Sequence, residues 1–165
     1  MSALQPYIAA LGERLGLALE MSPDGGFTAL LEGKHLLVQE LATGDALLFY
    51  MEVGRPTLFR RGEVLTELMG GNLFLAETRG ASLSYDAANE MVGLNLILPL
   101  YHLEDEEFIN AVDNIVAAAE DWGNKLLTLN AEAEERARQA GAALDFESGE
   151  QGEGAAPGTD QMLRI

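Results

Sequence analysis

The sequence predicts an α+β domain in which helices pack on one side of a twisted antiparallel sheet, in the order α-β-β-β-α-β-β-α. Three observations lead to this fold class. Short β-prone runs separated by glycine turns form two groups, over 27–53 and 81–100. Apolar residues at helical spacing precede, separate and follow these groups. The 165 residues, 48% of them hydrophobic, suffice for one core but not for two domains of ordinary size.

The first half of the chain is expected to form one helix and then a three-stranded meander. Ser2 is the expected helix cap, and "SPDGG" at 22–26 ends the segment. The apolar stripe of this helix consists of Leu4, Ile8, Leu11 and Leu15. The runs "FTALLE", "LLVQELA" and "ALLFYMEV" are separated by the turn residues 33–34 and 43–45. Glycine next to a polar residue between β-prone runs indicates a hairpin, so successive runs should pair.

The second half is expected to form a helix over 62–73, two paired strands over 81–100 and a long last helix. That last helix is the clearest element, because its apolar residues step by three and four: Phe108, Val112, Ile115, Ala119, Trp122, Leu126 and Leu129. Acidic residues at 104–107 occupy its first turn, where negative charge suits the exposed N–H groups. After a domain of 1–140, the Gly- and Glu-rich segment 141–165 is expected to be a disordered acidic tail.

The composition narrows the possible partners and the compartment. A formal net charge of -17 repels nucleic-acid phosphates and anionic lipids, so neither is an expected partner, and it favours solubility. The absence of cysteine excludes disulfides and thiolate chemistry. The N-terminus lacks the basic start and apolar stretch of a secretory signal, and no apolar run reaches the roughly 18 residues of a membrane span. We expect a soluble, cytoplasmic protein.

No enzyme, metal or cofactor chemistry is expected. The two histidines, His35 and His102, show no metal-ligand spacing with the carboxylates. A G-x-S-x-G elbow and a phosphate-binding glycine loop are both absent from the sequence. The carboxylates at 104–107 are consecutive on a helix and point in different directions, so they cannot converge on one ligand. The sequence therefore predicts no catalytic residue and no metal ligand.

Four phrases of the sequence carry a family resemblance. They are "ALLFYMEVG", "VLTELMGGNLF", "GLNLILPLYHLEDEEF" and "FINAVDNIVAAAEDW". In this order they resemble the third strand, second helix, last strand and closing helix of the class I type III secretion chaperones, the Tir chaperone family. The resemblance covers roughly residues 2–129. Gly70 and Gly71 depart from it, because the family tends to carry helix formers there, and so does the longer tail.

The resemblance implies a function. It implies a homodimer without ATP use or catalysis that binds the N-terminal segment of a secreted effector in extended form. The bound segment would stay soluble and ready for export in the bacterial cytoplasm, with the secretion apparatus as a further candidate partner. Strand addition to a sheet edge would supply main-chain hydrogen bonds, and pockets would select side chains.

Two sets of candidate site residues follow from the apolar pattern. The helix at 62–73 has more apolar surface than one face on its own sheet requires, so a two-fold dimer contact is expected through Leu65, Leu68, Met69, Leu73 and Phe74. The first strand has apolar residues on both faces, so an effector groove is expected along Tyr7, Leu11, Phe27 and Leu30. The alternative for each set is burial inside the subunit.

Two other functions fit the same composition. One is a small-ligand or regulatory α+β domain, which would contain a closed pocket with convergent polar groups. The other is an acidic decoy for a basic protein, whose binding would collapse with salt. An exposed apolar groove would favour the chaperone over both.

Overall fold

The computed structural model describes residues 3–150, with side chains described to residue 142. The elements follow the predicted order. They are α1 Gln5–Leu15, β1 Gly26–Leu31, β2 Lys34–Glu40, β3 Ala46–Gly54, α2 Arg61–Gly70, the short 3-10 helix η1 Leu73–Leu75, β4 Ser82–Asp86, β5 Met91–Pro99 and α3 Asp105–Glu150. Ser2, the expected cap, lies outside the described residues. Helix α1 instead follows Leu4 and has Pro6 in its first turn, where a missing N–H costs nothing.

The five strands form one antiparallel sheet in the order β1-β2-β3-β5-β4. The first three strands pair as the expected meander, with Phe27 opposite Val38 and Val38 opposite Phe49. Helix α2 carries the chain past β5 to the far edge, and β4 and β5 return as a hairpin that pairs β5 with β3. Among the described strands, β1 and β4 therefore lie at the two edges of the sheet. The α+β fold class is confirmed.

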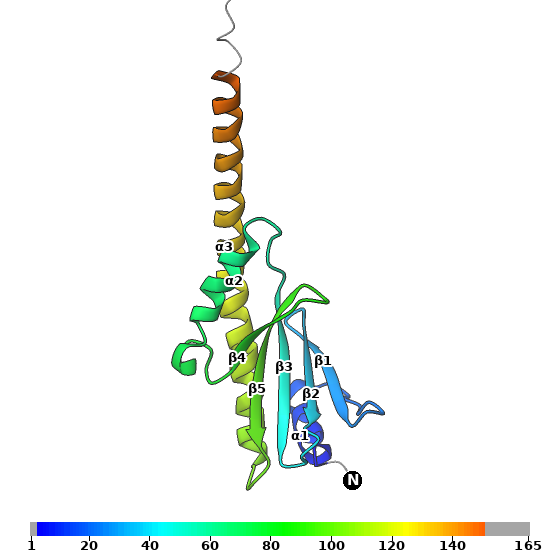
Figure 1. The fold of residues 1–165 in the computed structure, drawn as a ribbon. Coiled ribbons are helices and arrows are strands. Elements are labelled where there is room, and N and C mark those ends of the chain that lie inside the picture. Colours follow the sequence, from blue (N-terminus) through cyan, green and yellow to red (C-terminus); the bar gives the residue numbers. More distant parts are fainter. Residues whose placement is uncertain (1–2, 151–165) are drawn as a thin grey trace, which may run out of the picture.

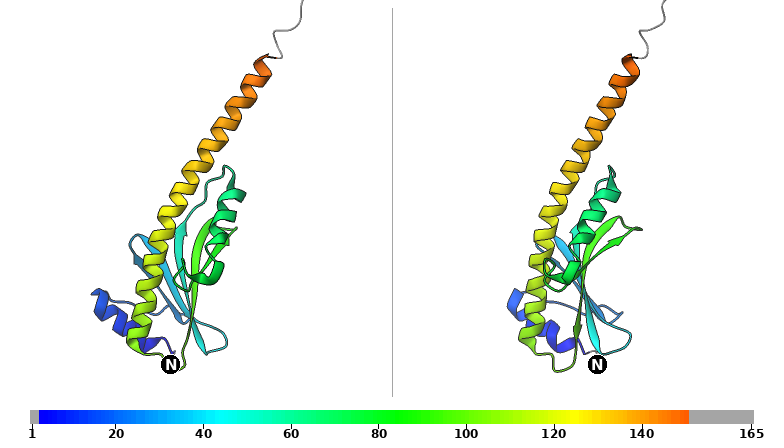
Figure 2. Two further views of the ribbon diagram at one scale, coloured as in Figure 1. Left: turned by 90° about the vertical axis from the view of Figure 1, so that its left-hand side faces the viewer. Right: turned by 60° about the vertical axis from the view of Figure 1, so that its left-hand side comes forward.

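Helices α1 and α3 cover one face of the sheet and leave the other face open (Figures 1 and 2). The core lies between them and is dominated by three buried phenylalanines, Phe27, Phe49 and Phe108. The rings of Phe49 and Phe108 lie 5.4 Å apart, which joins β3 to the first turn of α3. Alternation along β3 sends Leu47, Phe49 and Met51 into this core. Each fully buried side chain of this size contributes roughly 1.5–3 kcal/mol to folding.

Helix α3 confirms the predicted stripe and extends further than expected. Phe108, Val112, Ile115, Ala119, Trp122 and Leu126 are all buried. The first turn carries Asp105, Glu106 and Glu107, as the sequence indicated. The helix continues to Glu150, past the expected domain end at residue 140, and projects well beyond the sheet (Figure 1). Alanine-rich sequence at 131–143, a good helix former, accounts for this continuation. That residues 141–165 are a separate tail stays a prediction.

Helix α2 is held in place by its own buried side chains and by the loop that precedes it, which is bonded to α3. Val64 and Leu68 are buried between α2 and the body of the domain. The loop before α2 is fastened by Asn130 of α3, whose side chain accepts from the N–H of Thr57 at 2.8 Å and donates to the carbonyl of Arg55 at 3.0 Å. Within residues 3–150, no helix is both long and apolar enough to cross a membrane.

Candidate interaction surfaces

A hollow of about 490 Å³ lies beside the edge strand β1, where the sheet meets α1 and α3. Its walls come from three elements far apart in the sequence, so only the folded chain forms it. The apolar lining is Leu15, Leu30, Leu31, Val112, Val116 and Ala117, and the acidic lining is Glu32, Asp113 and Glu120. We call this hollow the edge groove.

Strand β1 gives the edge groove an open hydrogen-bonding border. Among the described strands, β1 pairs with β2 alone, so one row of its main-chain N–H and C=O groups has no strand partner there. Leu30 on this strand is 62% exposed, whereas Phe27 and Ala29 point into the core. An edge strand that also exposes an apolar side chain is a template for pairing with another extended chain.

The charges around the edge groove are partly paired. Arg14 of α1 forms an ion pair with Asp113 of α3 at 2.5 Å, and both side chains are about half exposed. Lys34 donates to the main-chain oxygen of Ala119 at 2.5 Å. Burial lowers the pKa of Lys34, and the charge of Glu120 opposes that effect. Acidic groups therefore flank an apolar floor.

Of the four residues expected to line an effector groove, the structure brings only Leu30 to the edge groove. Leu11 and Phe27 are 1% and 0% exposed and belong to the core. Tyr7 is half-buried: its ring stacks on Phe108 at 5.2 Å and its hydroxyl donates to the carbonyl of Leu103 at 3.0 Å. These residues are buried because the apolar stripe of α1 and the inner face of β1 both point toward α3.

A second exposed apolar surface lies at the end of α2. Phe74 is 89% exposed and Leu73 69%, while Met69 in the last turn of α2 is 41% exposed. We call residues 71–80, which contain η1, the knuckle. Of the other expected dimer residues, Leu65 is half-buried and Leu68 is 0% exposed. Leu68 packs inside the subunit, because it faces the body of the domain from the inner side of α2.

The knuckle is fixed to α3 by Trp122 and to β4 by Asn72. The indole Nε1 of Trp122 donates to the carbonyl of Glu77 at 3.1 Å. The same ring lies against Gly71 so closely that a Cβ there would be 2.0 Å from it. The Asn72 amide accepts from the Leu83 N–H at 2.7 Å and donates to the Leu83 carbonyl at 3.1 Å. Of the two glycines that depart from the family pattern, Gly71 is therefore required by the fold.

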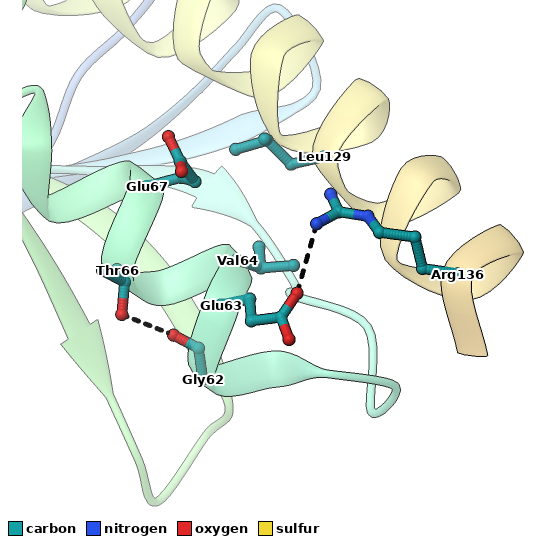
Figure 3. Close-up of a pocket in the computed structure, with 7 residues that line it drawn as sticks. All are labelled: Gly62, Glu63, Val64, Thr66, Glu67, Leu129 and Arg136. Carbon is teal, nitrogen blue, oxygen red and sulfur yellow. Dashed lines mark hydrogen bonds and ion pairs between the residues drawn. The ribbon is translucent and has the colours of Figure 1, made fainter. Parts of the chain in front are cut away.

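A second hollow, of about 250 Å³, lies between α2 and α3 (Figure 3). Val64 and Leu129 contribute its apolar part. Its one basic group is engaged, since Arg136 pairs with Glu63 at 3.2 Å. The pKa of Glu63 is lowered, chiefly by a hydrogen bond from Arg60. Because this hollow is open and its basic group already pairs with Glu63, it is not the closed pocket with convergent polar groups that a small-ligand domain would contain.

The open face of the sheet carries an apolar patch that the sequence analysis missed. Leu37 lies opposite Tyr50, and Leu48 lies opposite Ile97, which is 59% exposed. Tyr50 lies over Gly93, where a Cβ would come within 2.3 Å of its ring. The signal was present in the sequence, because "ALLFYMEV" has apolar residues at positions of both parities.

Metal chemistry has no support in the described part of the chain. Among residues 3–142, no three His, Asp or Glu side chains come together as a set of metal ligands. His35 lies in β2 with its Nδ1 atom 2.9 Å from a carboxylate oxygen of Glu52. His102 stacks edge-on against Tyr101 at 4.1 Å.

Comparison with known proteins identifies the fold and the family. The chain resembles the solved structure of the ExsC–ExsE complex with a TM-score of 0.67 and 21% identity, over 76% of this chain and 94% of that one. It resembles the ExoT–SpcS complex from Pseudomonas aeruginosa with a TM-score of 0.55 and 19% identity, over 72% and 96%.

A third similar structure is the Yersinia pestis type III secretion chaperone SycH in complex with a stable fragment of YscM2. Its TM-score is 0.54 and its identity 16%, over 69% of this chain and 94% of that one. No curated protein sequence matches the chain. The family model of the Tir chaperone protein (CesT) family matches residues 7–123, well over half of the chain. The family consists of chaperones and not of enzymes, and this chain belongs to it, as a class I chaperone of type III secretion.

Proposed function

We propose that the chain binds an N-terminal segment of a secreted effector in extended form and keeps it soluble and export-competent without ATP. The single observation that carries this is the edge groove, which joins an apolar floor to an unpaired strand edge. The family supports it, and so does the similar structure of the type III secretion chaperone SycH, which was solved in complex with a stable fragment of YscM2. The chaperone would act in the cytoplasm, before its effector reaches the secretion apparatus.

The edge groove suits an extended chain for two physical reasons. A segment laid along β1 would form main-chain hydrogen bonds that depend little on sequence. Its alternate side chains would reach the apolar floor at Leu31, Val112 and Val116, where burial contributes roughly 25 cal/mol per Å². Leu30 stands at the border and would be covered by the same segment.

The knuckle suits contact with a second copy of the chain. Leu73 and Phe74 of the knuckle form an exposed apolar group with Met69 of the last turn of α2, and aromatic residues are enriched at the centres of interfaces. A homodimer would cover this group around a two-fold axis. The net charge of -17 would keep the loaded dimer from associating further.

The effector proposal is tested by replacing Leu30 with Ser in the full chain. Leu127→Ser is the matched control, because Leu127 is the same residue type, is 68% exposed and lies outside the edge groove. Each tagged variant is expressed in the native cell, and co-purified partners are quantified by mass spectrometry. A secreted protein should be retained by wild type and by Leu127→Ser but lost from Leu30→Ser. Equal retention by both variants would place the client surface elsewhere.

A further inference from the structure

Trp122 contacts the knuckle at two points. The ring occupies the space beside Gly71, and the Nε1 atom donates to the carbonyl of Glu77 at 3.1 Å. Trp122 itself is 3% exposed, so it offers no surface to a partner. A single buried side chain of α3 therefore fixes two separated points of the segment that carries Leu73 and Phe74.

The backbone of the knuckle has a conformation that its residues would rarely adopt alone. Phe74, Leu75 and Arg79 have φ values of 59°, 54° and 54°, in the left-handed region that favours glycine. Such a conformation persists where the surrounding structure imposes it. The exposure of Phe74 is thus a consequence of contacts made elsewhere in the knuckle.

The remaining restraints hold the knuckle to itself and to β4. Thr78 is fully buried, and its hydroxyl donates to the carbonyl of Ala81, with the carbonyl of Leu75 3.2 Å from the same oxygen. The ion pairs Arg79–Asp121 and Lys125–Glu77 also reach α3, but they are solvent-exposed and therefore weak. The buried link to α3 runs through Trp122.

We propose that Trp122 is a positioning residue for self-association: it sets the place of Leu73 and Phe74 without touching the second copy. This rests on the proposed homodimer through the knuckle. Loss of the indole contacts would let the segment relax toward ordinary backbone angles. Phe74 would then leave the position in which it meets its counterpart.

The test is a double-mutant cycle on the dimer dissociation constant of the full chain, measured by sedimentation equilibrium. Trp122→Phe keeps a buried aromatic ring but removes the Nε1 donor and the outer ring beside Gly71. We expect Phe74→Ser to raise the dissociation constant at least about thirtyfold and Trp122→Phe to raise it about tenfold. The double variant should stay within about twofold of Phe74→Ser alone, because both changes act through one contact.

Two controls make the outcomes separable. Lys125→Met removes the ammonium 4.3 Å above the Trp122 ring and leaves the ring in place, so it should change the constant less than about twofold. Gly71→Ala displaces the ring from the other side and replaces Trp122→Phe in the cycle if that variant does not fold. A Trp122 effect of equal size with and without Phe74 would overturn the positioning role. No effect of Phe74→Ser would instead refute the dimer face itself.

Discussion

The ammonium group of Lys34 donates to the main-chain carbonyl of Ala119 at 2.5 Å, which joins the start of β2 to the first third of α3. It reaches the helix backbone because residue 123, one turn further along, is glycine. A Cβ at Gly123 would lie 2.7 Å from the Lys34 Nζ. Glycine is unfavourable in a helix interior, and the close approach of Lys34 explains its presence at position 123.

Gly123→Ala should raise the pKa of Lys34 toward its ordinary value of 10.5. Burial holds this pKa down, and the added methyl would move the ammonium toward water. A lowered pKa means that the unfolded chain binds this proton more tightly, so wild-type stability from Lys34 rises with pH up to 10.5. In Gly123→Ala, the stability contributed by Lys34 should no longer rise with pH in this range. The measurement is an NMR titration of the Lys34 Cε resonance, assigned by its absence in Lys34→Met. An unchanged pKa would show that the methyl leaves Lys34 in place.

Gly71→Ala and Gly70→Ala should have opposite effects on stability. A methyl on Gly71 would lie 2.0 Å from the Trp122 ring, and overpacking of this kind costs about 1–3 kcal/mol. A methyl on Gly70 meets nothing within 4 Å, and alanine favours the helix by up to about 1 kcal/mol. Urea unfolding measures both as shifts of the midpoint at constant m-value. Similar destabilisation by both variants would contradict the packing of Trp122 on Gly71.

The sequence predicted the order of elements because each has a local signal. The stripe from Phe108 to Leu126 and the turn at 33–34 depend on near neighbours in the chain. Gly71 had no such signal, because the residue that requires it, Trp122, lies in another helix. The sequence showed only that Gly70 and Gly71 depart from the family pattern.

The candidate surfaces were predicted less well than the fold. Periodicity assigned Leu11, Phe27 and Leu68 to the apolar face of a helix or strand. It cannot distinguish a position in the core from a position in a groove. Leu30 differs from them because it is an apolar residue at an outward position of β1, and it lines the edge groove. Val112 belongs to the apolar stripe of α3, and Val116 lies next to this stripe. Only the tertiary fold brings these two lining residues beside β1.

Leu68→Ala and Phe74→Ala should separate core from interface. Leu68 is fully buried, so its truncation should cost about 2–5 kcal/mol at every protein concentration. Phe74 is 89% exposed in the subunit, so its truncation should leave subunit stability nearly unchanged. It should instead abolish the rise of melting temperature with protein concentration that a dimer gives. A melting temperature that rises equally in wild type and Phe74→Ala would argue against the knuckle as the dimer contact.

Effector binding should depend little on salt. The groove floor is apolar, and strand pairing is between neutral groups, so raising NaCl from 0.1 to about 1 M should change the dissociation constant less than about fivefold. An acidic decoy that binds a basic protein would lose most of its affinity over the same range, because its contacts are screened. Calorimetry with the co-purified partner distinguishes the two.

Removal of residues 141–165 should leave the domain folded, with a melting temperature within about 5 °C of the full chain. The last strongly buried side chain described on α3 is Ala133, and Ala137 is half-buried. Residues 138–142 are exposed, so their helix contributes few contacts to offset its ordering entropy. The matched control is a chain ending at residue 130, which also loses Ala133 and the Arg136–Glu63 ion pair. It should melt more than about 5 °C lower. A drop of more than about 10 °C for the chain ending at residue 140 would mean that residues beyond it dock on the domain.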